Sequence, residues 1–351
     1  MRGNIGSILG KGRDPRSVVA GESIEHTHLC GVEVEMVGLA DCPVLVYWDA
    51  KRDGSIRGAG AMELTFTTPL GGADIESALE ELASFVSTQP RAGVNYSCST
   101  HVHLDVRDLT PQELARLIVC YLVFERGLYR LAGEGRYLSP FCAPLYSINN
   151  FVYDVASGAG GEWVSRAGNF GRYAGLNLAA IDRFGSLEFR HLEGTLDTQR
   201  IKEWINLAGS LKTYAQQGGD CYEILLRTSA GYVELCESIF GKRAPLFMYP
   251  AAEEDSLKGS RMAQDFLYLY DAHKGSPLQN EEDRAVEMGR CAPGSSGHSV
   301  ATKYQRNTKK SKTAEFLLGD LAPNDLHRIG AELFRDRGAV RADAIPDPEG
   351  E

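Results

Sequence analysis

Short segments that alternate between apolar and acidic or imidazole side chains recur along this chain, and they constrain its fold most strongly. In residues 30–36, apolar residues alternate with Glu33 and Glu35. A period of two places these two sets on opposite faces of a β-strand. Strands expected over 61–67, 101–106 and 186–192 repeat the pattern, and their polar positions hold Glu63, His101, His103, Glu188 and Arg190.

The composition of this polar face is unusually selective. A solvated sheet face would mix in lysine, threonine and serine, whereas these positions hold carboxylates, imidazoles and one guanidinium. If the strands are neighbours in one sheet, four carboxylates and two imidazoles share one face, and cations must neutralise them. Oxygen-rich coordination with one or two histidines favours Mg²⁺ or Mn²⁺ over Zn²⁺.

Further patterns predict the rest of the fold. Strands are expected over 44–48 and 172–181, and helices over 74–86, 111–132 and 201–217, the second of which begins with a capping box. Strand pairs and helices follow one another without strict βαβ alternation, and neither a Walker A loop nor a GxGxxG motif is present. The sequence therefore predicts an α+β fold with a largely antiparallel sheet.

The 351 residues exceed a typical single domain, so a core with an appendage is expected. Residues 1–28 are polar, basic and Gly-rich and predict a flexible N-terminal lead-in. Residues 29–220 are expected to form the catalytic core. Residues 221–351 are expected to form a helical C-terminal extension with a mobile basic loop at about 288–313.

Composition also excludes several classes of protein. A formal net charge of −10 argues against a protein that coats nucleic acid. The eight cysteines form no CxxC pair, which argues against a zinc ribbon or a redox dithiol. The longest apolar run, 117–124, is far shorter than the roughly 20 residues of a membrane-spanning helix, and the first residues lack the apolar region of a signal peptide. We therefore expect a cytoplasmic protein without membrane contact.

Five motifs in order, GVEVE, DGS, MELTFTTP, CSTHVHLD and SLEFRHLEGTLD, resemble those of the amidoligase family. That family is similar to glutamine synthetase and the glutamate–cysteine ligases, and the resemblance covers roughly residues 29–215. It implies a glutamine synthetase-like sheet with helices packed on one face and the active site on the other. It also implies ATP and Mg²⁺ (or Mn²⁺) as cofactors, and joining of a carboxylate to an amine through an acyl phosphate.

The resemblance implies roles for individual residues. Glu33 and Glu35 would each serve one of two metal sites, Glu63, His101 and Glu188 would be further ligands, and His103 would lie near the nucleotide phosphates. Arg190 would hold the substrate carboxylate or a phosphate, and together with Glu188 it would form the catalytic pair. A third carboxylate for the second metal has no clear match. The remaining candidates for binding ATP or substrate are Asp53, Ser55, Arg172, Asn177 and Glu193.

Two other function classes stay open at this point. The HxH pair could serve a metal-dependent hydrolase or oxygenase, although amidohydrolase barrels need further histidines and cupins need a glutamate soon after the second one. A binding protein that keeps the amidoligase fold without turnover is the other alternative, supported by the missing third ligand. The sequence names neither the small-molecule or peptide substrates nor the oligomeric state.

Overall fold

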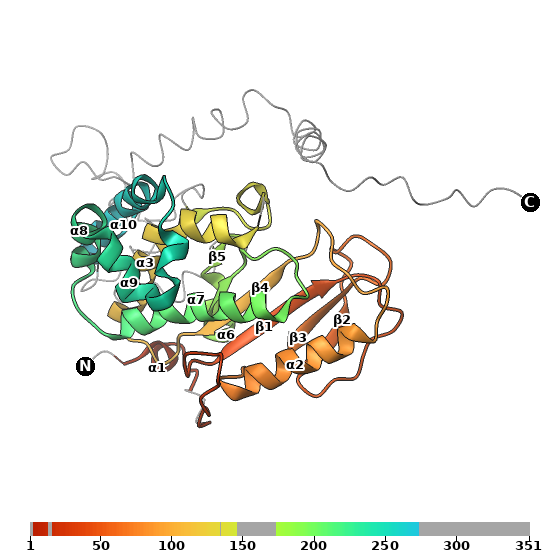
Figure 1. Ribbon diagram of the computed structural model, residues 1–351. Coiled ribbons are helices and arrows are strands. Elements are labelled where there is room, and N and C mark those ends of the chain that lie inside the picture. Colours follow the sequence, from red (N-terminus) through yellow and green to blue (C-terminus); the bar gives the residue numbers. More distant parts are fainter. Residues whose placement is uncertain (1–2, 13–15, 134, 146–172, 274–351) are drawn as a thin grey trace, which may run out of the picture. The chain divides into compact units, whose positions relative to one another are not determined.

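The computed structural model describes residues 3–12, 16–133, 135–145 and 173–273, and at its centre lies a six-stranded sheet (Figure 1). The strands follow the spatial order β2-β3-β1-β4-β6-β5, and every neighbouring pair is antiparallel. Their bounds are β1 Cys30–Met36, β2 Trp48–Arg52, β3 Met62–Phe66, β4 Thr100–Asp105, β5 Leu176–Asn177 and β6 Ser186–Phe189. Together with the helices this confirms the predicted α+β class.

The register of the central strands separates an apolar face from a polar one. Val32 of β1 lies opposite Val102 of β4, and Val34 lies opposite Leu64 of β3. These side chains are at most 1% exposed. The alternate residues of the same strands are the glutamates and histidines of the sequence motifs, which therefore share the other face.

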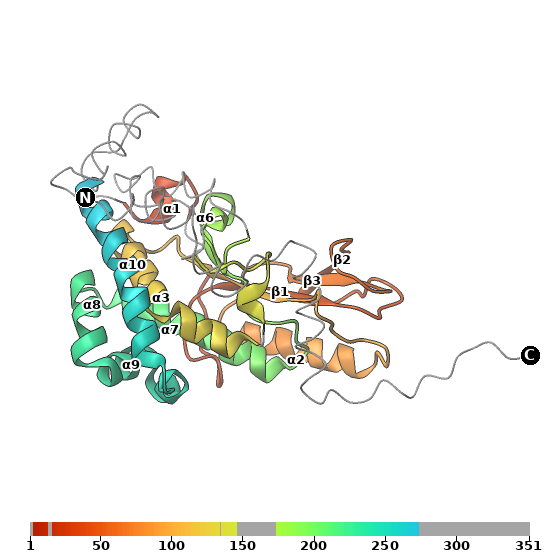
Figure 2. The same ribbon diagram turned by 90° about the horizontal axis from the view of Figure 1, so that it is seen from above.

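Helices cover the apolar face of the sheet. Helix α2 (Ala73–Ser87) and helix α7 (Thr198–Gln216) lie along the same side of it (Figures 1 and 2). The indole N–H of Trp48 in β2 donates to the Ala78 carbonyl of α2 across 2.8 Å, which joins the edge strand to this helix. Burial of this face leaves the polar face as the place for chemistry.

A helical layer adjoins the sheet. Its elements are α3 (Pro111–Ala132), α8 (Cys221–Ala230), α9 (Tyr232–Phe240), the 3₁₀ segment η4 (Gly241–Phe247) and α10 (Ala252–His273). The predicted capping box is present at the start of α3, where Thr110 and Glu113 bond each other's backbone N–H groups. Helix α10 packs on α3 so closely that a Cβ on Gly259 would lie 2.1 Å from the Leu122 carbonyl oxygen. This part of the C-terminal extension is thus packed onto the core.

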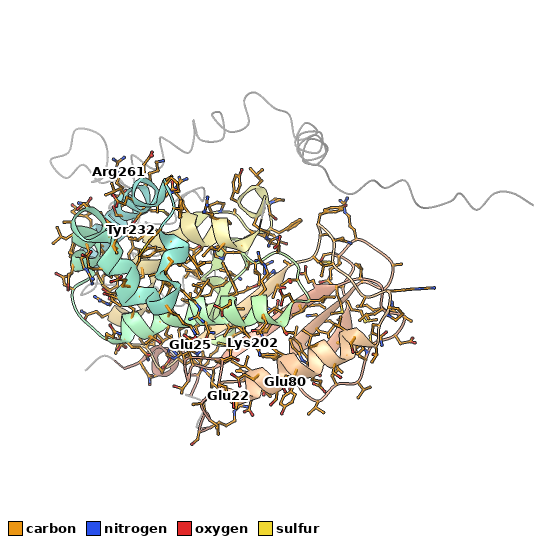
Figure 3. All side chains as sticks on the ribbon, in the orientation of Figure 1. Glu22, Glu25, Glu80, Lys202, Tyr232 and Arg261 are labelled. Carbon is orange, nitrogen blue, oxygen red and sulfur yellow. The ribbon has the colours of Figure 1, made fainter. Side chains whose placement is uncertain are left out.

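The N-terminal segment differs from the flexible lead-in expected over 1–28. The short helix α1 (Ile5–Ile8) buries Ile5 completely, and the backbone of 22–24 donates three N–H groups to the carboxylate of Glu76 on α2. The backbone N–H of Glu25 donates to the Asn206 side chain on α7. Figure 3 shows Glu25 beside this helix. Because these partners lie 52 to 181 positions away in the chain, local sequence patterns give no sign of them.

Two predicted strands also differ. Val46 and Tyr47 donate their N–H groups to the Glu81 carboxylate instead of a sheet neighbour, so β2 begins only at Trp48. The strand expected over 172–181 is reduced to β5, because Asn177 Oδ1 accepts the N–H of Ala179 and starts the helix α6 (Ala179–Phe184).

Other predictions concern the remainder of the chain. The basic loop predicted at 288–313 and residue Arg172 lie outside the described residues. Among the residues that the structure describes, no helix is long and apolar enough to cross a membrane.

Candidate metal centre

The polar face of the sheet brings the motif residues together. Glu33 lies opposite His101, His103 lies opposite Glu188, and Glu35 lies opposite Glu63. Antiparallel pairing along β3-β1-β4-β6 therefore makes neighbours of residues up to 155 positions apart. As the alternation predicted, the carboxylates and imidazoles form one cluster.

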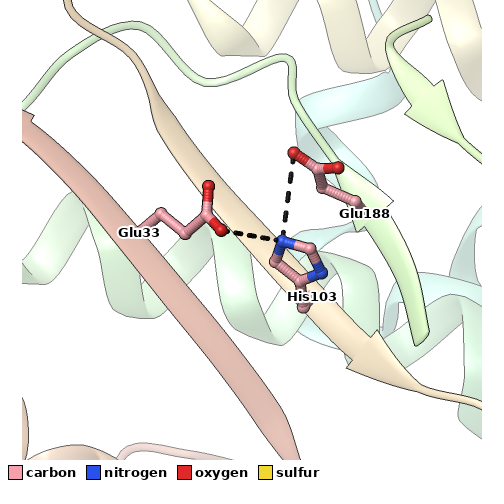
Figure 4. Close-up of side chains that lie close together, drawn as sticks. All are labelled: Glu33, His103 and Glu188. Carbon is pink, nitrogen blue, oxygen red and sulfur yellow. Dashed lines mark ion pairs between the residues drawn. The ribbon is translucent and has the colours of Figure 1, made fainter. Parts of the chain in front are cut away.

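Glu33, His103 and Glu188 form a first trio of possible metal ligands (Figure 4). One ligand atom from each residue lies within 4.8 Å of the other two. His103 Nε2 is 3.2 Å from Glu33 Oε1 and 3.9 Å from Glu188 Oε1. Each of the three comes from a different strand, so sheet register alone sets their spacing.

A second trio consists of Glu35, Asp53 and Glu63, with ligand atoms again within 4.8 Å of one another. Asp53 lies in the turn just after β2, where its Oδ1 accepts the N–H of Ser55 across 2.7 Å. The resemblance to the amidoligases implied a second metal site for which no third carboxylate could be matched. Asp53, which we expected beside the substrate, is a carboxylate that the structure places close to Glu35 and Glu63.

Ser99 connects the two trios, and sequence reasoning missed it. Its N–H and hydroxyl both lie within hydrogen-bond distance of Glu35 Oε2, at 2.7 and 2.8 Å, and the hydroxyl is also 2.8 Å from His101 Nε2. His101 Nδ1 in turn lies 3.0 Å from Glu33 Oε2. Ser99 sits two residues before His101, on the same strand face, and this spacing was the one available signal.

Both histidines lie beside the first trio, because His101 Nδ1 is 3.0 Å from Glu33 Oε2 and 3.4 Å from Glu188 Oε1. We expected His101 to be the metal ligand and His103 to contact phosphate, yet the first trio contains His103. Both ring nitrogens of His101 are engaged, one by Glu33 and the other by Ser99. His103 Nδ1 is held by the Ser186 hydroxyl at 3.1 Å, which leaves Nε2 directed at the two carboxylates.

Electrostatics favour the charged forms of Glu33 and His103 in the first trio and oppose the charged form of Glu63 in the second. Burial opposes ionisation of Glu33, but the adjacent imidazoles of His101 and His103 outweigh it and hold the pKa of Glu33 well below its usual range. Burial also opposes the charged form of His103, yet Glu33 and Glu188 raise its pKa overall. In the second trio, burial raises the pKa of Glu63, whereas the Ser55 N–H bond holds the pKa of Asp53 below its ordinary value against the effect of burial.

The residues present fit a divalent cation. His103 Nε2 is a buried atom without a hydrogen-bond partner, directed at two carboxylates. The groups behind the ligands are also in place, because Asn177 Nδ2 donates to Glu188 Oε2 across 2.6 Å and Ser186 holds His103. The two trios together offer five carboxylates and one imidazole, the oxygen-rich set typical of Mg²⁺ or Mn²⁺.

Arg190 lies at the edge of the first trio. Its guanidinium pairs with Glu188 Oε1 and donates to the Phe141 carbonyl across 3.2 Å. Arg136, from the 3₁₀ segment η1 (Arg136–Leu138), donates to the carbonyls of Arg190 and His191, at 2.8 and 2.6 Å. Arg136 therefore fixes the chain just after β6 and, with it, the base of the Arg190 side chain.

Three of the predicted binding residues stand apart from the trios or serve them indirectly. Glu193, which we expected to bind ATP or substrate, instead pairs with Arg200 of α7 across 2.7 Å. Ser55 is exposed and contributes its backbone N–H to Asp53. Asn177, expected to face substrate, holds Glu188 instead.

Comparison of the chain with models of known protein families finds no match, and comparison with curated proteins finds none either. The site's chemistry must therefore be argued from its geometry.

Proposed function

We propose that this chain is an ATP-dependent carboxylate–amine ligase related to the amidoligases, with Mg²⁺ or Mn²⁺ held on the polar face of its sheet. The observation that carries the proposal is the presence of two ligand trios side by side, held by adjacent antiparallel strands and by the turn after β2. Transfer of a phosphoryl group between two anions is the kind of reaction for which a pair of divalent sites is suited.

The reaction proceeds in two steps. An oxygen of the substrate carboxylate attacks the γ-phosphorus of ATP, the bond to the bridging oxygen breaks, and ADP leaves. The amine nitrogen then attacks the carbonyl carbon of the acyl phosphate, inorganic phosphate leaves, and a proton is released as the amide or isopeptide bond forms. Divalent cations bound by the trios would offset the negative charge on the phosphate oxygens.

The chain's own residues supply positioning. Arg190 presents a guanidinium beside Glu188 and suits a phosphoryl group or a carboxylate, both of which it can bind through two N–H groups. Glu188 is held by Asn177 on one oxygen and by Arg190 on the other. No protein nucleophile is needed, because ATP activates the carboxylate.

The fold supports the same proposal. Glutamine synthetase-like ligases carry their active site on one face of an antiparallel sheet whose other face is covered by helices. Here α2 and α7 cover the apolar face and both trios occupy the other. The predominance of carboxylates over imidazole in the trios also favours the ligase over a hydrolase or oxygenase built on the two histidines.

The test is ADP formation by the purified full-length protein with Mg²⁺-ATP and pooled amino acids, polyamines and carboxylic acids. The variants are Glu33→Gln and Glu188→Gln, with Glu80→Gln on the exposed side of α2 as the matched control. We expect substrate-dependent ADP release in the wild type and the control, and its loss in both site variants. Mass spectrometry of the reaction then identifies the amide product.

The outcome also separates the alternatives. ATP binding by calorimetry without ADP release under any substrate pool would favour a binding protein that does not turn over. If the protein shows no ATP binding and no ADP release, the proposal is refuted. Metal analysis for iron or zinc would then follow.

A further inference from the structure

Lys51 of β2 places an ammonium group at the second trio. It lies directly opposite Glu63 in the β2–β3 register, and its Nζ is 2.6 Å from Glu63 Oε1. The Glu63 side chain is 10% exposed, whereas that of Lys51 is 64% exposed. The ammonium therefore reaches from solvent onto a buried carboxylate that the second trio would use to hold a cation.

The same carboxylates act on Lys51 and would act on a metal ion. The pKa of Lys51 is raised, chiefly by its hydrogen bond with Glu63, and Glu33 and Asp53 contribute further attraction. Glu63 and Asp53 belong to the second trio and Glu33 to the first. Lys51 thus supplies a positive charge that offsets Glu63 when no other cation is bound.

We propose that Lys51 is a built-in counter-ion that competes with the second divalent cation for Glu63 and leaves when that cation binds. This inference rests on the metal site of the proposed function. Departure requires only rotation about the side-chain bonds of an exposed lysine, since the backbone pairing of β2 with β3 does not involve the ammonium. The second cation therefore binds more weakly than the geometry of its three carboxylates alone would allow.

The size of the effect follows from the exposure of the pair. An ion pair with one exposed partner is worth at most about 1 kcal/mol, so removing the lysine charge should tighten binding at the second trio by roughly two- to fivefold. Arg52, the next residue, offers a matched control. Its side chain points to the other face of the sheet, where it donates to the Ala40 carbonyl.

The experiment is a titration of the full chain with Mn²⁺ alone, without nucleotide. Binding is measured by calorimetry and by the EPR signal of free Mn²⁺. The variants are Lys51→Met, Lys51→Arg and Arg52→Met, each checked for folding by circular dichroism. We expect Lys51→Met to tighten the weaker of the two sites by roughly two- to fivefold, while Lys51→Arg and Arg52→Met keep the wild-type affinity. Adding Glu63→Gln to Lys51→Met should remove that site.

Three results would overturn the inference. The first is a second site in Lys51→Met that binds Mn²⁺ no more tightly than in the wild type. The second is an equal gain in Mn²⁺ affinity in Arg52→Met, which would mark a general charge effect. The third is that both the wild type and Lys51→Met bind at most one ion. The readout is metal affinity without ATP, so ligase turnover is tested separately by ADP release and the two proposals can fail independently.

Discussion

His191 should make the protein lose stability as the pH falls below neutrality. It follows β6 and is 0% exposed, surrounded by the rings of Tyr121, Tyr129 and Trp204 at centroid distances of 4.6 to 5.7 Å. Burial, with a smaller contribution from the charge of Arg136, lowers the pKa of His191 to about 3. The folded protein therefore holds this imidazole neutral well below the pH at which an exposed histidine gains its proton.

The hydrogen bonds around the ring agree with a neutral imidazole. The Tyr121 hydroxyl donates to Glu125 Oε1 at 2.9 Å, so across the 2.6 Å contact His191 Nε2 is the donor to the Tyr121 oxygen. Nδ1 then carries no proton, and it has no hydrogen-bond partner. A second proton would have to reside on Nδ1, in an apolar and aromatic environment without an acceptor.

The magnitude follows from linkage. In the unfolded chain the histidine titrates near its ordinary value of 6.5, so between 6.5 and about 3 the unfolded state binds the extra proton and the folded state does not. Stability is then full above the unfolded pKa and falls as the pH drops below it. Between about pH 8 and pH 5 the loss from this residue is about 2 kcal/mol.

The assay is urea unfolding of the wild type and His191→Phe at both pH values. The missing hydrogen bond with Tyr121 should make the variant about 1 kcal/mol less stable than the wild type at pH 8. Because its pH-dependent loss is about 2 kcal/mol smaller, the variant should be about 1 kcal/mol more stable than the wild type at pH 5. His26 and His28, whose pKa values burial lowers to about 4 and about 2, act in the same direction in both proteins and cancel in this comparison. An equal pH dependence in wild type and variant would refute the reasoning, as would an NMR titration of His191 near pH 6.5 in the native protein.

Three further predictions concern the site and the N-terminal segment. His103→Ala should weaken Mn²⁺ binding at the first trio at least tenfold, and more than His101→Ala does. Of the two histidines, only His103 directs a nitrogen without a hydrogen-bond partner at Glu33. Calorimetry of both variants compares the two losses of affinity. Ser99→Ala should weaken Mn²⁺ binding about tenfold through the lost support of a carboxylate, with little change in the thermal melting temperature. Glu76→Ala should lower the free energy of unfolding by about 2 kcal/mol, since three backbone N–H groups of 22–24 lose their acceptor. Urea unfolding measures this loss, and an unchanged midpoint would contradict the packing of the N-terminal segment on α2.

The sequence could predict what depends on periodicity within a strand. Alternation in β1 and β4 identified Glu33, Glu35, His101 and His103 as residues of one face, and the pairing register confirms it. Ser99 belongs to the same alternation but was missed, because a lone serine on a strand carries no chemical signal until its carboxylate and imidazole partners are known.

Features that depend on long-range contacts could not be predicted. Asp53 follows the end of β2, where alternation no longer applies, and only the position of β2 beside β3 brings it to Glu63. The orientation of the two histidines likewise depends on which ring nitrogens other strands engage, since Ser186 of β6 contacts His103 and Glu33 of β1 contacts His101. Burial of the N-terminal segment depends on Glu76 and Asn206 in the same way.

The trios themselves help to specify the register of the sheet. A slip of one residue between β1 and its neighbours would turn Glu33 and Glu35 toward α2 and α7, into a face whose side chains are almost entirely buried. A carboxylate buried there without a partner would cost several kcal/mol of folding free energy. The backbone hydrogen bonds that the slipped strands still form could not offset this cost. In the observed register Glu33 lies beside the imidazoles of His101 and His103, Glu35 is bonded by Ser99, and Lys51 pairs with Glu63. The residues proposed to bind metal thus also exclude the alternative sheet.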